Sequence, residues 1–157
     1  MTVPKFYRDY AELLGLPESP LMYRIFDILY DGEDDLKLLS TMPASAETIS
    51  EATGIPLDDV NEKLELLWKK GGIVKAMGMY AIIPGMIALR DMSVMWPQAS
   101  REFFELWEEV FTKEHDRFVA HMKKMNYPSA MRVVPVQESV DSQSRVLDID
   151  SARKIFQ

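Results

Sequence analysis

The chain has 157 residues, 47% of them hydrophobic, and a formal net charge of −7 at pH 7. The hydrophobic share excludes an intrinsically disordered chain, and the acidic balance argues against broad affinity for nucleic acid. Because there is no cysteine, the chain lacks disulfides, thiolate nucleophiles and cysteine ligands for a cluster. The longest apolar run is far shorter than a membrane span and the start carries no secretory signal, so we expect a cytoplasmic protein that does not enter a membrane.

Three helices are predicted in the first part of the chain. Apolar residues at helical spacing predict the first helix over residues 3–15. Ser19 and Pro20 begin the second, because proline suits the first turn of a helix, and this helix ends near residues 31–32. A short third helix is expected to pass through residues 36–39.

Residues 45–72 have the pattern of a helix-turn-helix. Ser45 can cap the first helix, and Gly54 permits the turn because glycine tolerates a positive φ. A small β-hairpin is predicted over residues 73–84, with its turn near residues 77–78. Helix, turn, helix and hairpin in this order indicate a winged helix. We therefore predict a mainly α fold (α+β), with the hairpin as the wing and additional helices at both ends.

A single long helix is predicted over residues 97–126. Phe104, Phe111, Phe118 and Met125 recur every seven residues, with Trp107 beside them. Most of this stripe is expected to be core. It also fits a homodimer seam, because apolar residues extend to more than one side of the helix, and the pairing residues would be Phe104, Trp107 and Phe111. The predicted domain covers residues 1–127, and residues 128–157 are an extended tail or linker with a short terminal helix.

The charge of the helix-turn-helix and hairpin argues against DNA recognition. Residues 43–90 contain five cationic and six anionic side chains, so this module carries a net charge of −1. Asp58, Asp59 and Glu62 open the helix that would enter a DNA groove, where donors and cations are needed. The two aspartates also suit the positive end of a helix dipole. Protein contact is therefore favoured over DNA binding. If the chain does bind DNA as the alternative, the residues expected near the duplex are Asn61, Lys63, Lys69, Lys70 and Lys75.

The apolar hairpin and the methionine content indicate a protein-binding surface. The chain has 11 methionines, several of them in and after the hairpin. Flexible thioethers fill irregular gaps in cores, but they also line adaptable binding surfaces. An apolar tip suits neither solvent nor phosphate, so Met77, Met79 and Tyr80 are predicted to contact a protein partner or an adjoining domain.

No catalytic, cofactor-binding or metal-binding residue is predicted. The sequence has no glycine-rich phosphate loop, no serine elbow and no HExxH motif. His115 and His121 lie six residues apart, which places them on different faces of a helix. The chain is therefore predicted to be a non-catalytic binding module and not an enzyme.

Two stretches, LLSTMPASAETISEATGIPLDDVNEKLELLWKKGGIV and YAIIPGMIALRDMSVMWPQASREFFELWEEVF, resemble the amino-terminal region of ferredoxin-like iron–sulfur proteins of anaerobic microbes. The resemblance covers residues 20–157. It implies a winged-helix portion, followed by a segment similar to MRVVPVQESVDSQSRVLDIDSARKIFQ that leads into cysteine motifs for 4Fe–4S clusters. No ligand carries over, because this chain has no cysteine. The chain is expected to be either a fragment whose cluster lies beyond Gln157 or a stand-alone relative that partners an iron–sulfur protein.

Residues 43–84 are more distantly similar to MarR-like transcription regulators. This similarity implies a dimer that places the alternative residues named above near DNA. The chain departs from that pattern at the acidic opening of the second helix and at the short apolar wing. A DNA-binding regulator is therefore the alternative to the protein-interaction module.

Overall fold

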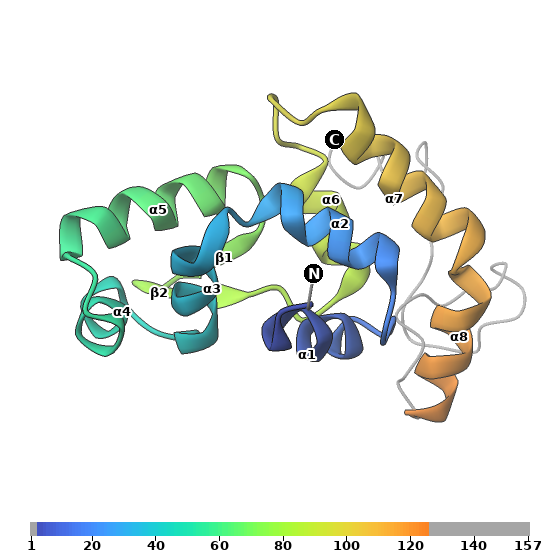
Figure 1. Ribbon diagram of the computed structural model, residues 1–157, viewed down its shortest axis with the longest axis horizontal. Coiled ribbons are helices and arrows are strands. Elements are labelled where there is room, and N and C mark those ends of the chain that lie inside the picture. Colours follow the sequence, from blue (N-terminus) through green and yellow to red (C-terminus); the bar gives the residue numbers. More distant parts are fainter. Residues whose placement is uncertain (1–2, 126–157) are drawn as a thin grey trace, which may run out of the picture. The chain divides into compact units, whose positions relative to one another are not determined.

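A computed structural model of the chain describes residues 3–125 (Figure 1). The chain divides into two units, Met1–Asn126 and Tyr127–Gln157, and the described residues lie in the first. The tail predicted over residues 128–157, with its short terminal helix, lies outside the described residues.

The described part is mainly helical with one two-stranded antiparallel sheet, as predicted. The helices are α1 (Lys5–Leu13), α2 (Pro20–Leu29), α3 (Gly32–Thr41), α4 (Ala46–Thr53), α5 (Leu57–Lys69), α6 (Met86–Ser93), α7 (Arg101–Lys113) and α8 (His115–Lys124). The strands are β1 (Ile73–Ala76) and β2 (Met79–Ile82). The three helices predicted in the first part of the chain are α1, α2 and α3.

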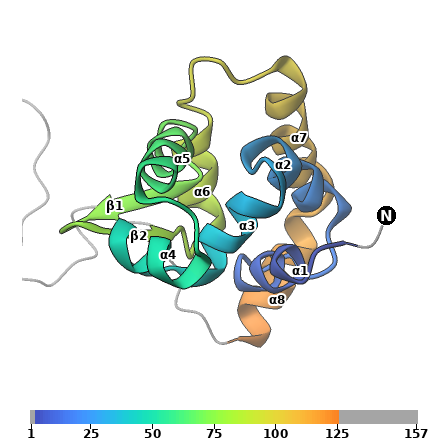
Figure 2. The ribbon, with the colours of Figure 1, turned by 60° about the vertical axis from the view of Figure 1, so that its left-hand side comes forward.

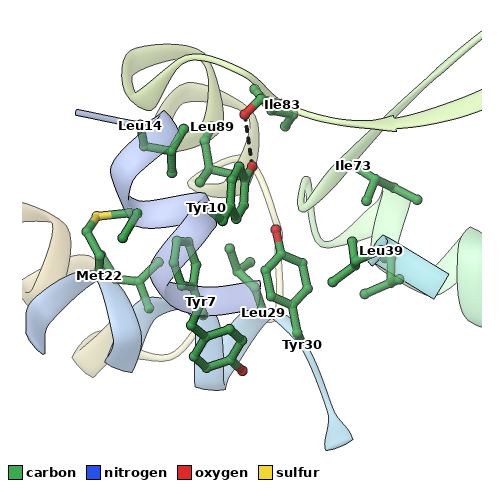
Figure 3. Packing of buried hydrophobic residues seen from close by; sticks show 14 of the residues in the cluster. Tyr7, Tyr10, Leu14, Met22, Leu29, Tyr30, Leu39, Ile73, Ile83 and Leu89 are labelled. Carbon is green, nitrogen blue, oxygen red and sulfur yellow. Dashed lines mark hydrogen bonds between the residues drawn. The ribbon is translucent and has the colours of Figure 1, made fainter. Parts of the chain in front are cut away.

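An aromatic cluster joins the N-terminal helices to the segments around the hairpin. Tyr10 of α1 stacks on Phe26 of α2 with ring centroids 5.0 Å apart. The Tyr10 hydroxyl donates a hydrogen bond of 2.9 Å to the carbonyl of Ile83 (Figure 3), and the Tyr30 hydroxyl donates one of 3.0 Å to the carbonyl of Gly72. Because all these groups are buried, each hydroxyl satisfies a carbonyl that water does not reach. The two ends of the hairpin are thereby fixed to the helical core.

Local signals define α4, α5 and the turn between them. The Ser45 hydroxyl accepts a hydrogen bond from the backbone N–H of Thr48, which caps α4. Gly54 ends α4 with a φ of +72°, a left-handed conformation that costs glycine little. Helix α5 then buries a stripe at helical spacing: Val60, Leu64 and Leu67.

The predicted hairpin is confirmed, and a third segment pairs with it. Strands β1 and β2 are antiparallel, with Ile73 opposite Ile82. Ala44, which lies between α3 and α4, forms an isolated bridge to Tyr80 through hydrogen bonds of 3.1 and 2.8 Å. The hairpin lies beside α5 in both views of the ribbon (Figures 1 and 2), and α5 contacts β1.

Helix α6 was not predicted. It has only eight residues, and Gly85 at its start supplies no capping side chain, so the usual sequence signals are lacking. Tertiary packing stabilises it instead. A Cβ atom on Gly71 would lie 2.4 Å from the carbonyl oxygen of Met92, so the end of α6 lies directly against the backbone two residues after the end of α5.

The prediction of one helix over residues 97–126 is wrong. Helix α7 begins at Arg101, after a Ser100 cap, and a separate helix α8 begins at His115. Between them the backbone of Glu114 leaves the helical region, with φ −114° and ψ 3°.

Packing explains this break. The Arg117 guanidinium donates to Glu114 at 3.0 Å and to the carbonyl of Pro17 at 2.8 Å. A Cβ atom on Gly15 would lie 3.0 Å from the ring of Phe118, so α8 rests on the connection between α1 and α2. Helix α7 contacts α2 instead. Helices α7 and α8 therefore pack against different parts of the fold, which the periodicity of the sequence alone does not reveal.

Candidate functional site

The hairpin tip presents apolar side chains to solvent. Met77 and Gly78 form the two-residue loop with φ values of +51° and +77°, and a positive φ at both positions is the pattern of a type I′ turn. The Met77 side chain is fully exposed, and Met79 is 43% exposed. Tyr80, predicted as a contact residue with them, is instead 6% exposed, because its backbone pairs with Ala44 and its side chain joins the core.

Met77 is an unusual residue for this turn. A left-handed conformation costs a residue with a Cβ atom about 1–2 kcal/mol, and Asn, Asp or Gly are the usual choices. Being fully exposed, the Met77 side chain recovers none of this cost through burial among the described residues. An apolar side chain held in a strained position at a tip is a feature that packing does not explain, and such positions are often functional.

Two of the four lysines in the alternative DNA set have partners in the core or close to it. The Nζ atom of Lys63 lies 3.3 Å from Oδ1 of Asp35, a carboxylate that is only 5% exposed. Lys70 donates a hydrogen bond of 3.2 Å to the carbonyl of Leu29, and its Nζ atom lies 5.4 Å from the centroid of the Trp96 ring. Both ammonium groups therefore support the fold, because they neutralise or satisfy groups with little access to water.

The other two lysines also have partners within the chain. Lys69 pairs with Glu65 one turn earlier on α5, with 3.3 Å between Nζ and Oε1. The Nζ atom of Lys75 lies 5.1 Å from the centroid of the Tyr80 ring, and interaction with the Tyr80 side chain raises the pKa of Lys75. Asn61, the fifth residue of the set, is exposed.

The carboxylates at the start of α5 are exposed and unpaired. Asp58, Asp59 and Glu62 are all exposed, and within residues 3–125 no cation lies within ion-pair distance of them. The first turns of α5 therefore present negative charge to solvent, while the nearby positive charge is paired. A polyanion meets repulsion at this surface, since phosphate contacts need free cations.

Sequence reasoning missed three exposed apolar residues of α5. Leu57 is 39% exposed, Leu66 is 50% exposed and Trp68 is 44% exposed. They lie outside the buried stripe of Val60 and Leu64, and this offset is the signal that could have identified them. Leu57 and Trp68 lie close to one line along the helix, because eleven positions make nearly three turns.

The apolar face of α7 is rotated by one residue from the predicted stripe. Its buried residues are Phe103, Leu106, Trp107 and Val110, whereas Phe104 is 43% exposed. Trp107, which was predicted to pair with a second copy, is 2% exposed, so its side chain belongs to the core and offers little surface to a partner. Phe111 is half-buried, and the Arg90 guanidinium lies 5.5 Å from its ring centroid.

A hollow of about 390 Å³ lies between α6 and α7. Its lining combines aromatic faces with charged rims: Arg90, Val94, Phe104, Trp107, Glu108, Phe111 and Thr112. Within the described residues, the buried Nε1 of Trp107 has no hydrogen-bond acceptor. The three residues predicted for dimerisation therefore border one surface, but only Phe104 is substantially exposed there.

The described residues offer no cluster of metal ligands. Among residues 3–125, no group of three or more His, Asp or Glu side chains is placed to hold a metal ion. The Nδ1 atom of His115 lies 3.5 Å from Oδ1 of Asp116. An iron–sulfur cluster needs thiolate ligands, and this chain has no cysteine, so its residues do not fit that cofactor.

The helices between residues 3 and 125 are all too short or too polar to cross a lipid bilayer. Comparisons of the chain with protein-family models, with curated proteins and with solved structures give no match.

Proposed function

We propose that this chain is a winged-helix module that binds another protein or an adjoining domain and performs no catalysis. The order of elements supports this assignment: α3, the Ala44 bridge, α4, α5, β1 and β2 follow one another as in winged helices. In this assignment α5 is the helix that would read DNA in a regulator, and the hairpin is the wing.

The hairpin tip is the proposed contact site, and the conformation of Met77 is the observation that carries the proposal. A fully exposed methionine in a left-handed turn is costly for the isolated chain. A partner that covers Met77 and Met79 offsets this cost by burying apolar area, at about 25 cal/mol per Å². Methionine suits such a role because its flexible side chain adapts to the surface it meets.

The resemblance to ferredoxin-like iron–sulfur proteins indicates the kind of partner. The module would serve as the N-terminal part of such a protein, or as a separate chain that binds one. Because this chain has no cysteine, it would supply no ligand to the cluster. Its contribution would be to position the cluster-bearing partner.

A DNA-binding regulator remains the alternative function, and the ion pairs of α5 argue against it. Freeing Lys63 for a phosphate would leave the buried carboxylate of Asp35 without its cation. Lys70 and Lys75 are likewise engaged with Leu29 and Tyr80. A duplex would therefore meet Asp58, Asp59 and Glu62 before it met a free cation.

The hairpin contact is tested with two aspartate variants and a matched control. The full chain, Met77→Asp, Met79→Asp and Met95→Asp are each used to capture proteins from an extract of the source cells, followed by mass spectrometry. Met95 is 77% exposed and lies outside the hairpin, so it controls for the loss of an exposed methionine. We expect one partner to be captured by the full chain and by Met95→Asp, and lost with both hairpin variants. Equal capture by all four proteins would remove the hairpin from the contact.

A homodimer through α7 is also proposed, now centred on Phe104. Phe104 is 43% exposed beside the hollow between α6 and α7, and Trp107 there has an indole N–H without an acceptor. Sedimentation equilibrium of the chain, of Phe104→Asp and of Leu13→Asp measures the pairing. Leu13 is 45% exposed on α1 and serves as the control. A dimer that only Phe104→Asp dissociates supports this seam, whereas a monomeric wild type contradicts it.

A further inference from the structure

The hollow between α6 and α7 is bordered by opposite charges as well as by aromatic rings. The Arg90 guanidinium lies on its α6 side, 5.5 Å from the centroid of the Phe111 ring, and Glu108 borders it from α7. Arg90 pairs with the exposed carboxylate of its neighbour Asp91 at 3.0 Å, whereas Glu108 has no ion-pair partner among residues 3–125. Two exposed side chains of opposite charge therefore border one hollow without pairing with each other.

The same surface carries a projecting aromatic ring beside an apolar depression. Phe104 is 43% exposed, whereas Trp107, almost one turn later on α7, is 2% exposed. Phe104, Trp107 and Phe111 are three and four positions apart in turn, so they share one side of the helix. The hollow, with a volume of about 390 Å³, is large enough to admit an aromatic ring. A partner that covers this surface must therefore offer an apolar side chain for the hollow and an apolar surface for Phe104.

A second copy of this chain meets both requirements. In a dimer with two-fold symmetry the two copies use the same patch, so each contact occurs twice and the patch must be complementary to itself. A patch with one cation and one anion, and with one projecting ring and one hollow, satisfies this condition. A partner of uniform charge would instead place one of the two rim charges against its own sign, which is unfavourable.

We propose that two copies of this chain pair about a two-fold axis through this surface, with Phe104 of each copy in the hollow of the other and Arg90 of each copy opposite Glu108 of the other. The two rings supply the desolvated centre of the contact, and the two ion pairs at its rim fix the orientation of the copies. This inference rests on the proposed homodimer through α7 and adds the arrangement of the two copies and the residues that select it.

The test reverses the two charges one at a time and then mixes the variants. Sedimentation equilibrium measures the dissociation constant of the full chain, of Arg90→Glu and of Glu108→Arg. Alone, each variant places two like-charged pairs across the axis, so we expect its dissociation constant to rise by about tenfold or more. In an equimolar mixture, one copy of each variant restores two oppositely charged pairs, so we expect dimers of wild-type affinity. Restoration in the mixture also shows that both variants are folded.

Matched variants on another helix separate a local contact from the net charge of the chain. Arg8 and Glu12 are exposed on α1 and do not line the hollow. The substitutions Arg8→Glu and Glu12→Arg change the net charge by the same amounts as the two reversals at the hollow. We expect both to dimerise as the wild type does. Equal weakening by the reversals on α1 and at the hollow would overturn the proposal, because dimerisation would then respond to net charge alone.

The outcomes distinguish this arrangement from the proposed homodimer itself. A dimer that Phe104→Asp dissociates, but that neither charge reversal weakens, would overturn the arrangement and leave the α7 seam in place. Variants that each weaken the dimer and do not pair when mixed would also overturn it, because the two charges would then not face each other across the axis. A monomeric wild type would contradict the homodimer and this arrangement together, and the hairpin contact would be unaffected.

Discussion

Lys63 offers a direct test of the claim that the lysines of α5 serve the fold. Its Nζ atom lies 3.3 Å from Oδ1 of Asp35, whose other carboxylate oxygen accepts a 2.8 Å hydrogen bond from the backbone N–H of Asp31. The Asp35 side chain is 5% exposed, whereas that of Lys63 is 32% exposed. The substitution Lys63→Met removes the ammonium group and keeps most of the aliphatic stem. It leaves a buried carboxylate with only part of its hydrogen bonding.

The expected loss follows from the burial of Asp35. Breaking a fully buried ion pair costs about 3–5 kcal/mol, and leaving a buried acceptor unsatisfied costs about 1–3 kcal/mol. Because a third of the Lys63 side chain is exposed, water can replace part of its contact. We therefore expect the free energy of unfolding to fall by about 2 kcal/mol. In a chain of this size, that is a decrease in Tm of about 6 °C.

Lys69→Met is the matched control for this measurement. Lys69 pairs with Glu65 on the surface of the same helix, where the two side chains are 63% and 46% exposed. Exposed pairs of this kind contribute about 0.5 kcal/mol or less. Urea unfolding of both variants, monitored by far-UV circular dichroism, gives the two free energies. Equal and small losses would refute the reasoning, because the pair of Lys63 with the buried Asp35 would then contribute no more to stability than an exposed pair.

Two further predictions concern stability. Burial raises the pKa of Tyr10, because the folded state disfavours the ionised phenolate. The neutral phenol therefore stabilises the folded state fully below the ordinary tyrosine pKa of about 10, and this stabilisation is lost as the pH rises above that value. Tm should therefore fall above about pH 10, and less steeply in Tyr10→Phe; equal slopes in a thermal-melt series would contradict this. Gly71→Ala should lower the free energy of unfolding by about 3 kcal/mol, because the φ of Gly71 is +69° and a Cβ atom there would clash with Met92. Gly54→Ala should lower it by about 1 kcal/mol, because Gly54 has a similar φ of +72° but open space around it. Denaturant unfolding that ranks Gly54→Ala as the costlier change would show that the packing of α6 is misjudged.

The parts of the fold that were predicted correctly depend on short-range signals. Ser19 and Ser45 cap their helices through residues three positions later, and Gly54 supplies a left-handed turn in place. The hairpin turn at residues 77–78 joins strands of four residues each. In each case the residues that determine the structure are neighbours in the sequence, so the sequence alone contains the information.

The features that were missed depend on contacts between distant residues. Helix α6 has no capping side chain and is held by packing near Gly71. The break at Glu114 accompanies a contact between Arg117 and Pro17, one hundred positions apart. Tyr80 is withdrawn from the surface by its pairing with Ala44. No periodicity in the sequence reveals these neighbours.

The candidate site divides in the same way. Exposure of Met77 and Met79 follows from the hairpin turn, and the acidic opening of α5 can be read from the sequence itself. The partners of the lysines were not visible in the sequence, since Asp35 precedes Lys63 by 28 positions and Leu29 precedes Lys70 by 41. Because these distant partners engage Lys63 and Lys70, the structure gives a specific reason against DNA binding, whereas the sequence alone provides only a count of charges.

The central claim is that the hairpin tip binds a protein and that α5 does not bind DNA. The most direct measurement is a titration of labelled random-sequence duplex DNA with the full chain, followed by fluorescence anisotropy at low and at physiological salt. We predict no saturable binding at either salt concentration, because the carboxylates at the start of α5 face solvent and both lysines of α5, Lys63 and Lys69, are ion-paired. Saturable binding that weakens steeply as salt is added would contradict the account, since that dependence reports the release of counterions from phosphates by free cations.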